Sequence, residues 1–154
     1  MRKPVLAKTS MDMSIEELAG RTDHRKLATW AADCAGRVLP YFEEQYPDDP
    51  RPRAAIEALR AWVKTGVFRM ADVRKASLDA HAAARNAGEF TSARSAARAA
   101  GQAMATAHVA RHALAAAIYA ATAVRDATPS PGADAATLRE RQWQYQHLIE
   151  LAES

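Results

Sequence analysis

The stretch that most constrains this chain is residues 91–125, TSARSAARAAGQAMATAHVARHALAAAIYAATAVR, in which alanine is the commonest residue and no acidic residue occurs. Alanine is the best helix former because its side chain loses no rotamer freedom on folding. About a quarter of the whole chain is alanine, whereas Gly (6) and Pro (7) are few. The sequence therefore predicts an all-α fold.

One unbroken helix over residues 92–125 would be about 50 Å long, but a compact 154-residue domain has a radius of gyration of about 15 Å. We therefore expect a break. The best site is 106–111, where the β-branched residues Thr106 and Val109 lie, and Gly101 is the alternative. This predicts two helices, about 92–106 and 109–126.

The rest of the chain shows helical periodicity interrupted by proline and glycine. We expect a flexible tail over residues 1–12 and a compact single-domain bundle or array of about six main helices over residues 13–154. The main helices are predicted over about 23–46, 52–66, 71–87, 92–106, 109–126 and 134–152.

Several local features set the expected helix ends. Ser14 and Glu17 resemble a capping box for a short helix that ends near Ala19. Pro40 should end or kink its helix, and Gly88 should follow a helix as the C′ glycine. The inner face of the last helix, capped by Asp134, is expected to contain Leu138, Gln142, Tyr145, Leu148, Ile149 and Ala152.

The net charge of +3 is mild, and no block of Lys and Arg marks a nucleic-acid-binding tail. The excess of Arg over Lys fits either a GC-rich genome or arginines kept for bidentate contacts with carboxylate or phosphate. No signal peptide is evident, and the near-apolar run 113–124 is too short to span a bilayer. We expect a cytoplasmic protein without a membrane partner, and nucleic acid is the weakest of the partner hypotheses.

His108 and His112 are four residues apart and would share a helix face if the helix continued through them. Such a pair is half of a zinc site, which His81 or Asp79 could complete only through folding. No second pair of ligands is present in the sequence, so we expect histidines of the core or surface and predict no metal and no cofactor.

Arg94 and Arg98 lie one helical turn apart without an acidic residue in their own helix. With Arg85 and Arg111 they could form a face that binds an acidic group or phosphate. The alternative is pairing within the chain, with the acidic group Glu43, Glu44, Asp48 and Asp49.

One hypothesis for the function is a small-molecule-binding module with a polar pocket near His81, Arg85 and His112. The same pocket would also be lined by Trp30, Trp62, Tyr119 and Trp143.

Cys34 lies on an apolar helix seam without a nearby histidine, which is typical of a small core residue. We therefore do not expect an enzyme.

Several runs of residues are more specific than alanine richness. They are WAADC at 30–34 with VLP at 38–40, RPRAAIEA at 51–58 with Trp62, AHAAAR at 80–85, AARAAG at 96–101, ATAHV at 105–109 and His112-Ala113. Over about residues 25–125 the chain resembles a bacterial family of small helical immunity proteins, the Imm-five-like domain, and the last helix lies outside this resemblance.

The resemblance implies a protein that binds and neutralises a toxin made by the same cell or its kin, without catalysis. It carries no set of toxin-contacting residues onto this chain. A docking face would be the basic helix 92–106 or the acidic loop 43–49, and the candidate partner- or ligand-binding residues are His81, Arg85, Arg94, Arg98, His108 and His112. Alanine-faced helices would also allow a homodimer.

Overall fold

The computed structural model describes residues 5–67, 69–89 and 91–154. Those residues form seven helices and no strand, which confirms the all-α fold. The seventh helix, beyond the six main ones expected, is the short N-terminal α1. The helices are α1 (Asp12–Gly20), α2 (His24–Glu43), α3 (Arg51–Thr65), α4 (Met70–Asn86), α5 (Ser92–Ala105), α6 (His112–Ala127) and α7 (Ala133–Glu153).

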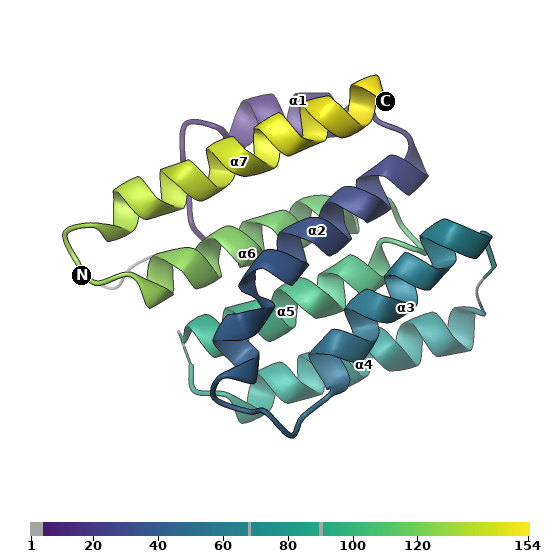
Figure 1. The fold of residues 1–154 in the computed structure, drawn as a ribbon, viewed down its shortest axis with the longest axis horizontal. Coiled ribbons are helices and arrows are strands. Elements are labelled where there is room, and N and C mark those ends of the chain that lie inside the picture. Colours follow the sequence, from purple (N-terminus) through teal and green to yellow (C-terminus); the bar gives the residue numbers. More distant parts are fainter. Residues whose placement is uncertain (1–4, 68, 90) are drawn as a thin grey trace.

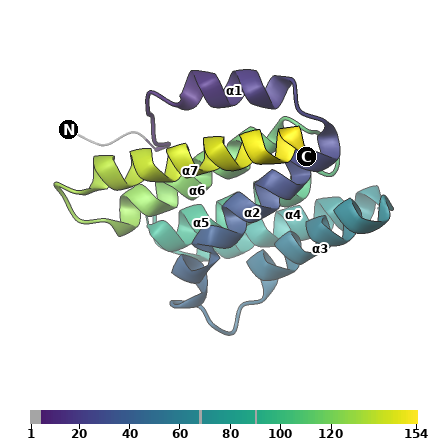
Figure 2. The same cartoon turned by 45° about the horizontal axis from the view of Figure 1, so that its top comes forward.

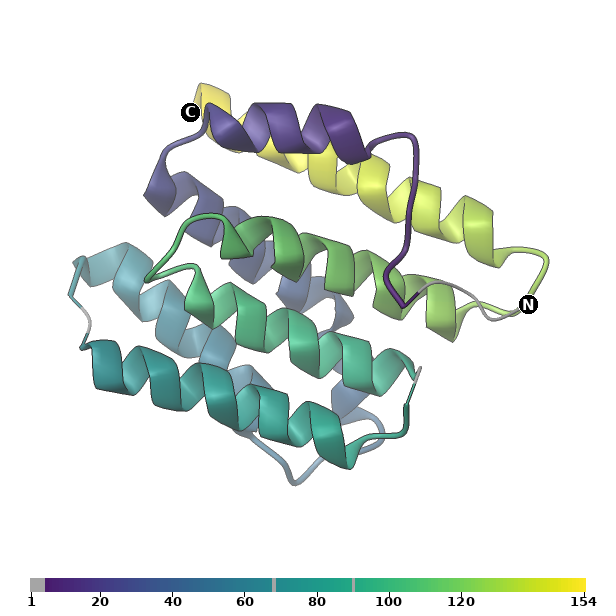
Figure 3. The ribbon, with the colours of Figure 1, turned by 180° about the vertical axis from the view of Figure 1, so that it is seen from behind.

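The helices lie in two layers. In one layer α3, α2 and α7 lie side by side (Figure 1). In the other layer α4, α5 and α6 are neighbours, as the view from behind shows (Figure 3). Helix α1 lies against α7 at one edge of the array (Figure 2). The alanine-rich stretch thus supplies α5 and α6, two of the three helices of this second layer.

Helix α5 is the centre of the packing, because it contacts α2, α3, α4 and α6. It is buried on all sides but the one that carries Arg94, Arg98 and Gln102, and only small side chains fit between helices that approach so closely. Its buried residues are Ala93, Ser95, Ala96, Ala97, Ala99, Ala100, Gly101, Ala103 and Met104. The alanine faces that would allow a dimer are here packed inside the domain.

The predicted break in the alanine-rich stretch is confirmed. Helix α5 ends at Ala105, and α6 begins at His112 after a turn. Thr106 is buried in this turn, its hydroxyl donates to the Gln102 carbonyl (3.1 Å), and its own carbonyl is bonded by the His24 ring from α2. The break is therefore held by a contact with the other layer.

The expected inner face of α7 is confirmed at the buried Leu148 and at Tyr145, which is partly buried against the core, and is wrong at Gln142. The buried residues of α7 are Thr137, Glu140, Arg141, Gln144 and Leu148, whereas Gln142 is exposed. Gln144 donates to the Ala117 carbonyl of α6 (2.9 Å) and accepts from Arg141 (2.8 Å). Because buried hydrogen-bonding partners are available there, a polar side of α7 faces the core.

Three of the local signals are also corrected. Asp12, not Ser14, begins α1, and Met11 at its N-cap makes no side-chain capping bond. Helix α2 continues through Pro40 to Glu43, so the proline does not end it: Pro40 removes one backbone bond, but the last turn buries Phe42 in the core. Gly88 is not a left-handed C′ residue: α4 ends in extended backbone at Ala87, and among the described glycines only Gly66 has a positive φ, 74°.

Residues 5–11 of the segment expected as a flexible tail run beside α6, and residues 1–4 lie outside the described part of the chain. The Ala7 amide donates to the Thr122 hydroxyl (2.9 Å), and the Val5 carbonyl accepts from Arg125 (3.1 Å). Of the helices that the structure describes, none has the length and apolar character needed to cross a membrane.

Candidate functional site

The candidate site is built around the contact between α4 and α5. The ring of His81 on α4 lies against Gly101 on α5, where an added Cβ would come within 2.7–2.9 Å of three ring atoms. Arg98, one turn before Gly101, donates from Nη1 to His81 Nδ1 (2.8 Å). Because a guanidinium can only donate, the proton of the neutral imidazole is on Nε2.

The environment keeps His81 uncharged at neutral pH. Burial first, and then the nearby charges of Arg98, Arg85 and His112, lower the pKa of His81 from 6.5 to about 4. The pKa of Arg98 is also lowered, by burial first and then by the charge of Arg94. A neutral His81 can therefore hold the Arg98 side chain in place without cancelling its positive charge.

His81 and His112 come to neighbouring positions of α5, but His108 does not join them. His112, the first residue of α6, hydrogen-bonds through Nδ1 to the Gln102 side-chain oxygen (2.8 Å). His108 lies in the exposed turn before α6, so the shared helix face with His112 does not form. In the described part of the chain no three His, Cys, Asp or Glu side chains are grouped to hold a metal ion.

Arg85, Arg94 and Arg98 form what we call the basic face. None of the three makes an ion pair with a described residue. Arg111, the fourth arginine considered, is exposed just before α6 and is likewise unpaired among these residues. The face carries positive charge that no described carboxylate neutralises by direct contact.

The acidic group that could have paired with these arginines is engaged elsewhere. Glu43 accepts two hydrogen bonds from Arg53 (2.8 and 2.6 Å), and Asp49 accepts two from the side chain of Arg51 (2.9 and 2.8 Å). The hydrogen bond from Arg53 lowers the pKa of Glu43, which favours its charged form. The alternative of pairing within the chain is therefore wrong for these two carboxylates.

A cavity of about 420 Å³ opens beside the basic face. Arg94, Ser95 and Arg98 line it from α5, and Tyr119 and Asp126 line it from α6. Ser95 is only 8% exposed, yet its hydroxyl makes no hydrogen bond to a described residue and is reached from the cavity. The cavity thus combines two cationic groups with free hydroxyl groups.

The large aromatic residues do not form one cleft around this site. Trp30 is fully buried and donates to the Gln144 carbonyl (2.8 Å), and the Trp62 ring lies 5.0 Å from the His24 ring. Trp143 lies on α7 beside Arg37, whose guanidinium carbon is 3.9 Å from the ring centroid. Only Tyr119 of the four lines the cavity at the basic face.

Sequence reasoning missed a groove of about 620 Å³ between α2, α3 and α7. Asp33 at its base binds both Arg60 (2.8 Å) and His147 (2.7 Å), and Trp143 stacks on His147 with ring centroids 4.8 Å apart. The spacing of Trp143 and His147, four apart in sequence, is the one signal that could have placed them together.

The charged groups of this groove satisfy one another. Arg37 donates to both carboxylate oxygens of Glu140 (2.8 and 2.9 Å), and this hydrogen bonding raises the pKa of Arg37. A groove whose charges are already paired offers a ligand less than one whose charges are not. The basic face is therefore the stronger candidate.

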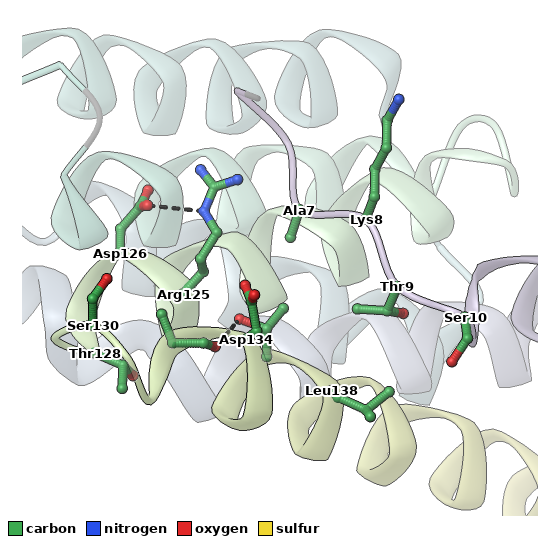
Figure 4. Close-up of a pocket in the computed structure, with 12 residues that line it drawn as sticks. Ala7, Lys8, Thr9, Ser10, Arg125, Asp126, Thr128, Ser130, Asp134 and Leu138 are labelled. Carbon is green, nitrogen blue, oxygen red and sulfur yellow. Dashed lines mark hydrogen bonds and ion pairs between the residues drawn. The ribbon is translucent and has the colours of Figure 1, made fainter. Parts of the chain in front are cut away.

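A further cavity, of about 560 Å³, lies between residues 7–10, the end of α6 and the start of α7 (Figure 4). Arg125 and Asp126 stand at one end of it, joined by an ion pair of 3.0 Å, and Lys8 extends away from it in the figure. Asp126 lines this cavity and also the one at the basic face. Val5 lines the cavity at the basic face and Ala7 lines this one, so the N-terminal segment also borders both.

The fold and the site together define a small all-helical protein with an unneutralised basic face. The chain belongs to the family described as Imm-5 like putative immunity protein, whose model matches residues 17–151. The match extends beyond the stretch 25–125 at both ends and includes all of α7 but its last two residues, so the expectation that the last helix lies outside the family is wrong. The searches of curated proteins and of solved structures found no match.

Proposed function

We propose that this protein binds and neutralises a cognate bacterial toxin without catalysis, and that the basic face of Arg85, Arg94 and Arg98 is its docking surface. The observation that carries the proposal is the absence of a described carboxylate partner for these three arginines. Membership of an immunity-protein family supplies the class of partner.

The charge of this face suits recognition of an acidic surface. Complementary charges raise the rate of association and discriminate against wrong partners. Arg94 and Arg98 are half-buried on a rigid helix, so their side chains lose less freedom on binding than those of a mobile loop. His108 and His112 lie at the opposite end of α5 from Arg94, and we place them at the edge of the surface.

Binding without catalysis is consistent with the state of the cysteine. Burial raises the pKa of the Cys34 thiol well above its ordinary value, so the reactive thiolate is disfavoured. His81 is bonded through Nδ1 to Arg98 and so serves to position that side chain.

The test begins with capture of partners from a lysate of the source organism, followed by identification by mass spectrometry. Each captured protein is then expressed alone and together with this chain in a host cell. We expect one captured protein to stop growth alone and this chain to restore growth. A set of captured proteins of which none is toxic, or whose toxicity this chain leaves unchanged, refutes the proposal.

The docking surface is tested separately by charge reversal. The double variant Arg94→Glu and Arg98→Glu should weaken toxin binding by about tenfold or more, because charge-assisted hydrogen bonds are worth about 1.5–3 kcal/mol. Lys64→Glu on α3 with Arg139→Glu on α7 changes the net charge equally at exposed residues of the other helix layer and serves as the control. Equal weakening by both pairs would show that the net charge, not this face, governs binding.

A further inference from the structure

The cavity beside the basic face presents several hydrogen-bond donors that make no bond to a described acceptor. Arg98 uses Nη1 on His81, which leaves its other N–H groups for a further partner, and the Arg94 side chain makes no hydrogen bond to a described residue. Ser95 and Tyr119 add hydroxyl groups that are also unbonded within the described chain. Two guanidinium groups and two hydroxyl groups around one cavity suit an oxyanion.

The charges around the cavity indicate how much negative charge it accepts. Arg94 and Arg98 are positive, whereas Glu89 and Asp126 are negative. The Asp126 carboxylate is already bonded to Arg125 (3.0 Å), so the exposed Glu89 alone is left to face two arginines. One added negative charge balances the site, and a phosphate dianion would exceed the balance.

The placement of Arg94 adds a second reason for an anion. Arg94 lies in the first turn of α5, where the helix dipole is positive and disfavours a cation. Its charge is also among the causes that lower the pKa of Arg98. A bound carboxylate would relieve both repulsions at once.

We propose that this cavity binds a single carboxylate group, and that an acidic side chain of the toxin supplies it. The second half of this inference rests on the proposed function, but the first half does not. A cavity of about 420 Å³ has room for the end of a Glu or Asp side chain that enters between α5 and α6.

The carboxylate site is tested on the free chain with sodium acetate as the probe. Acetate is titrated against sodium chloride at constant ionic strength, and the Arg Nε–Hε signals are followed by NMR. We expect saturable shifts of the Arg94 and Arg98 signals, with an affinity on the order of millimolar because the ligand is small. Arg94→Gln changes a side chain that makes no hydrogen bond or ion pair to a described residue, and it should weaken acetate binding by about tenfold.

Arg139→Gln on α7 removes one positive charge elsewhere and should leave acetate binding unchanged. The site is refuted if no signal saturates, or if Arg139→Gln weakens acetate as much as Arg94→Gln does. A parallel titration with inorganic phosphate checks the charge argument. Tighter binding of phosphate than of acetate at the same arginines would overturn the assignment to a single carboxylate.

The source of the carboxylate is tested with the captured toxin. Acetate at saturating concentration should compete with the toxin, and Arg94→Gln should weaken the complex by about tenfold. If acetate binds but neither change affects the complex, the toxin is not the source; toxin neutralisation still stands, and the charge-reversal variants decide the docking surface. If no toxin is captured, the proposed function fails, while the acetate titration still decides the site.

Discussion

Gly101→Ala is the substitution that most directly tests the packing behind the basic face. In the interior of a helix, Gly to Ala alone gains about 0.5–1 kcal/mol. At Gly101 the new methyl group would lie 2.7 Å from Nε2, 2.8 Å from Cε1 and 2.9 Å from Cδ2 of His81. The ring cannot easily turn aside, because its Nδ1 is bonded to Arg98.

Overpacking of this kind costs about 1–3 kcal/mol. We therefore expect Gly101→Ala to lower the free energy of unfolding by about 0.5–2 kcal/mol, measured by urea unfolding followed by circular dichroism. Gly36→Ala on α2 is the matched control, because its Cβ would meet Arg60 Nη2 at 3.5 Å, an ordinary contact. That variant should instead be more stable by about 0.5–1 kcal/mol.

A double-mutant cycle isolates the contact. When His81→Ala is combined with Gly101→Ala, the collision is absent, so the second substitution should no longer destabilise the protein. We expect a coupling free energy of about 1 kcal/mol or more. The reasoning is refuted if Gly101→Ala stabilises the protein as Gly36→Ala does, or if the coupling is zero.

Three further predictions concern stability and reactivity. The pKa of His81 is about 4 in the folded protein and ordinarily 6.5, so the unfolded chain binds more protons between these pH values. Acidification from pH 6.5 to 4 should therefore lower the free energy of unfolding, by about 1–2 kcal/mol after allowance for solvent exposure. The substitution His81→Gln should remove this contribution. Gln144→Leu deprives the buried Arg141 of a hydrogen bond and should destabilise the protein by about 1–3 kcal/mol in urea unfolding, whereas Leu at the exposed Gln142 should be nearly neutral. Cys34 should resist a thiol reagent in the native protein and react in denaturant.

Each of these has an outcome that contradicts it. A pH dependence that is the same in His81→Gln would show that other groups govern acid stability. Equal effects of Leu at positions 144 and 142 would mean that the buried polar face of α7 contributes little. Rapid native labelling of Cys34 would mean that the core around α2 opens readily.

The sequence was sufficient where neighbouring residues decide the structure. Alanine propensity predicts the helices, the need to fit a compact domain predicts the break before His112, and Thr91 caps α5 as its residue type suggests. Gly66 ends α3 in the left-handed conformation for the same local reason. The absence of an acidic residue in the helix of Arg94 and Arg98 was also readable.

Tertiary packing decided what distant residues do to one another. Arg37 pairs with Glu140 across 103 positions of sequence, which no local pattern indicates. The polar face of α7 is buried because Ala117 and Asp12 offer partners there, and apolar periodicity alone pointed to a different face. Ion pairs and buried hydrogen bonds depend on positions that exist only when the layers meet.

The same distinction applies to the candidate site. From the sequence alone, Arg94 and Arg98 could equally have paired with the acidic residues near position 45 or remained unpaired. The fold engages Glu43 with Arg53 and Asp49 with Arg51, and sets Arg98 against a neutral His81. The sequence by itself determined that these arginines lack an acid within their own helix, and only the tertiary structure decided that no described carboxylate reaches them, because that depends on how the helices pack around α5.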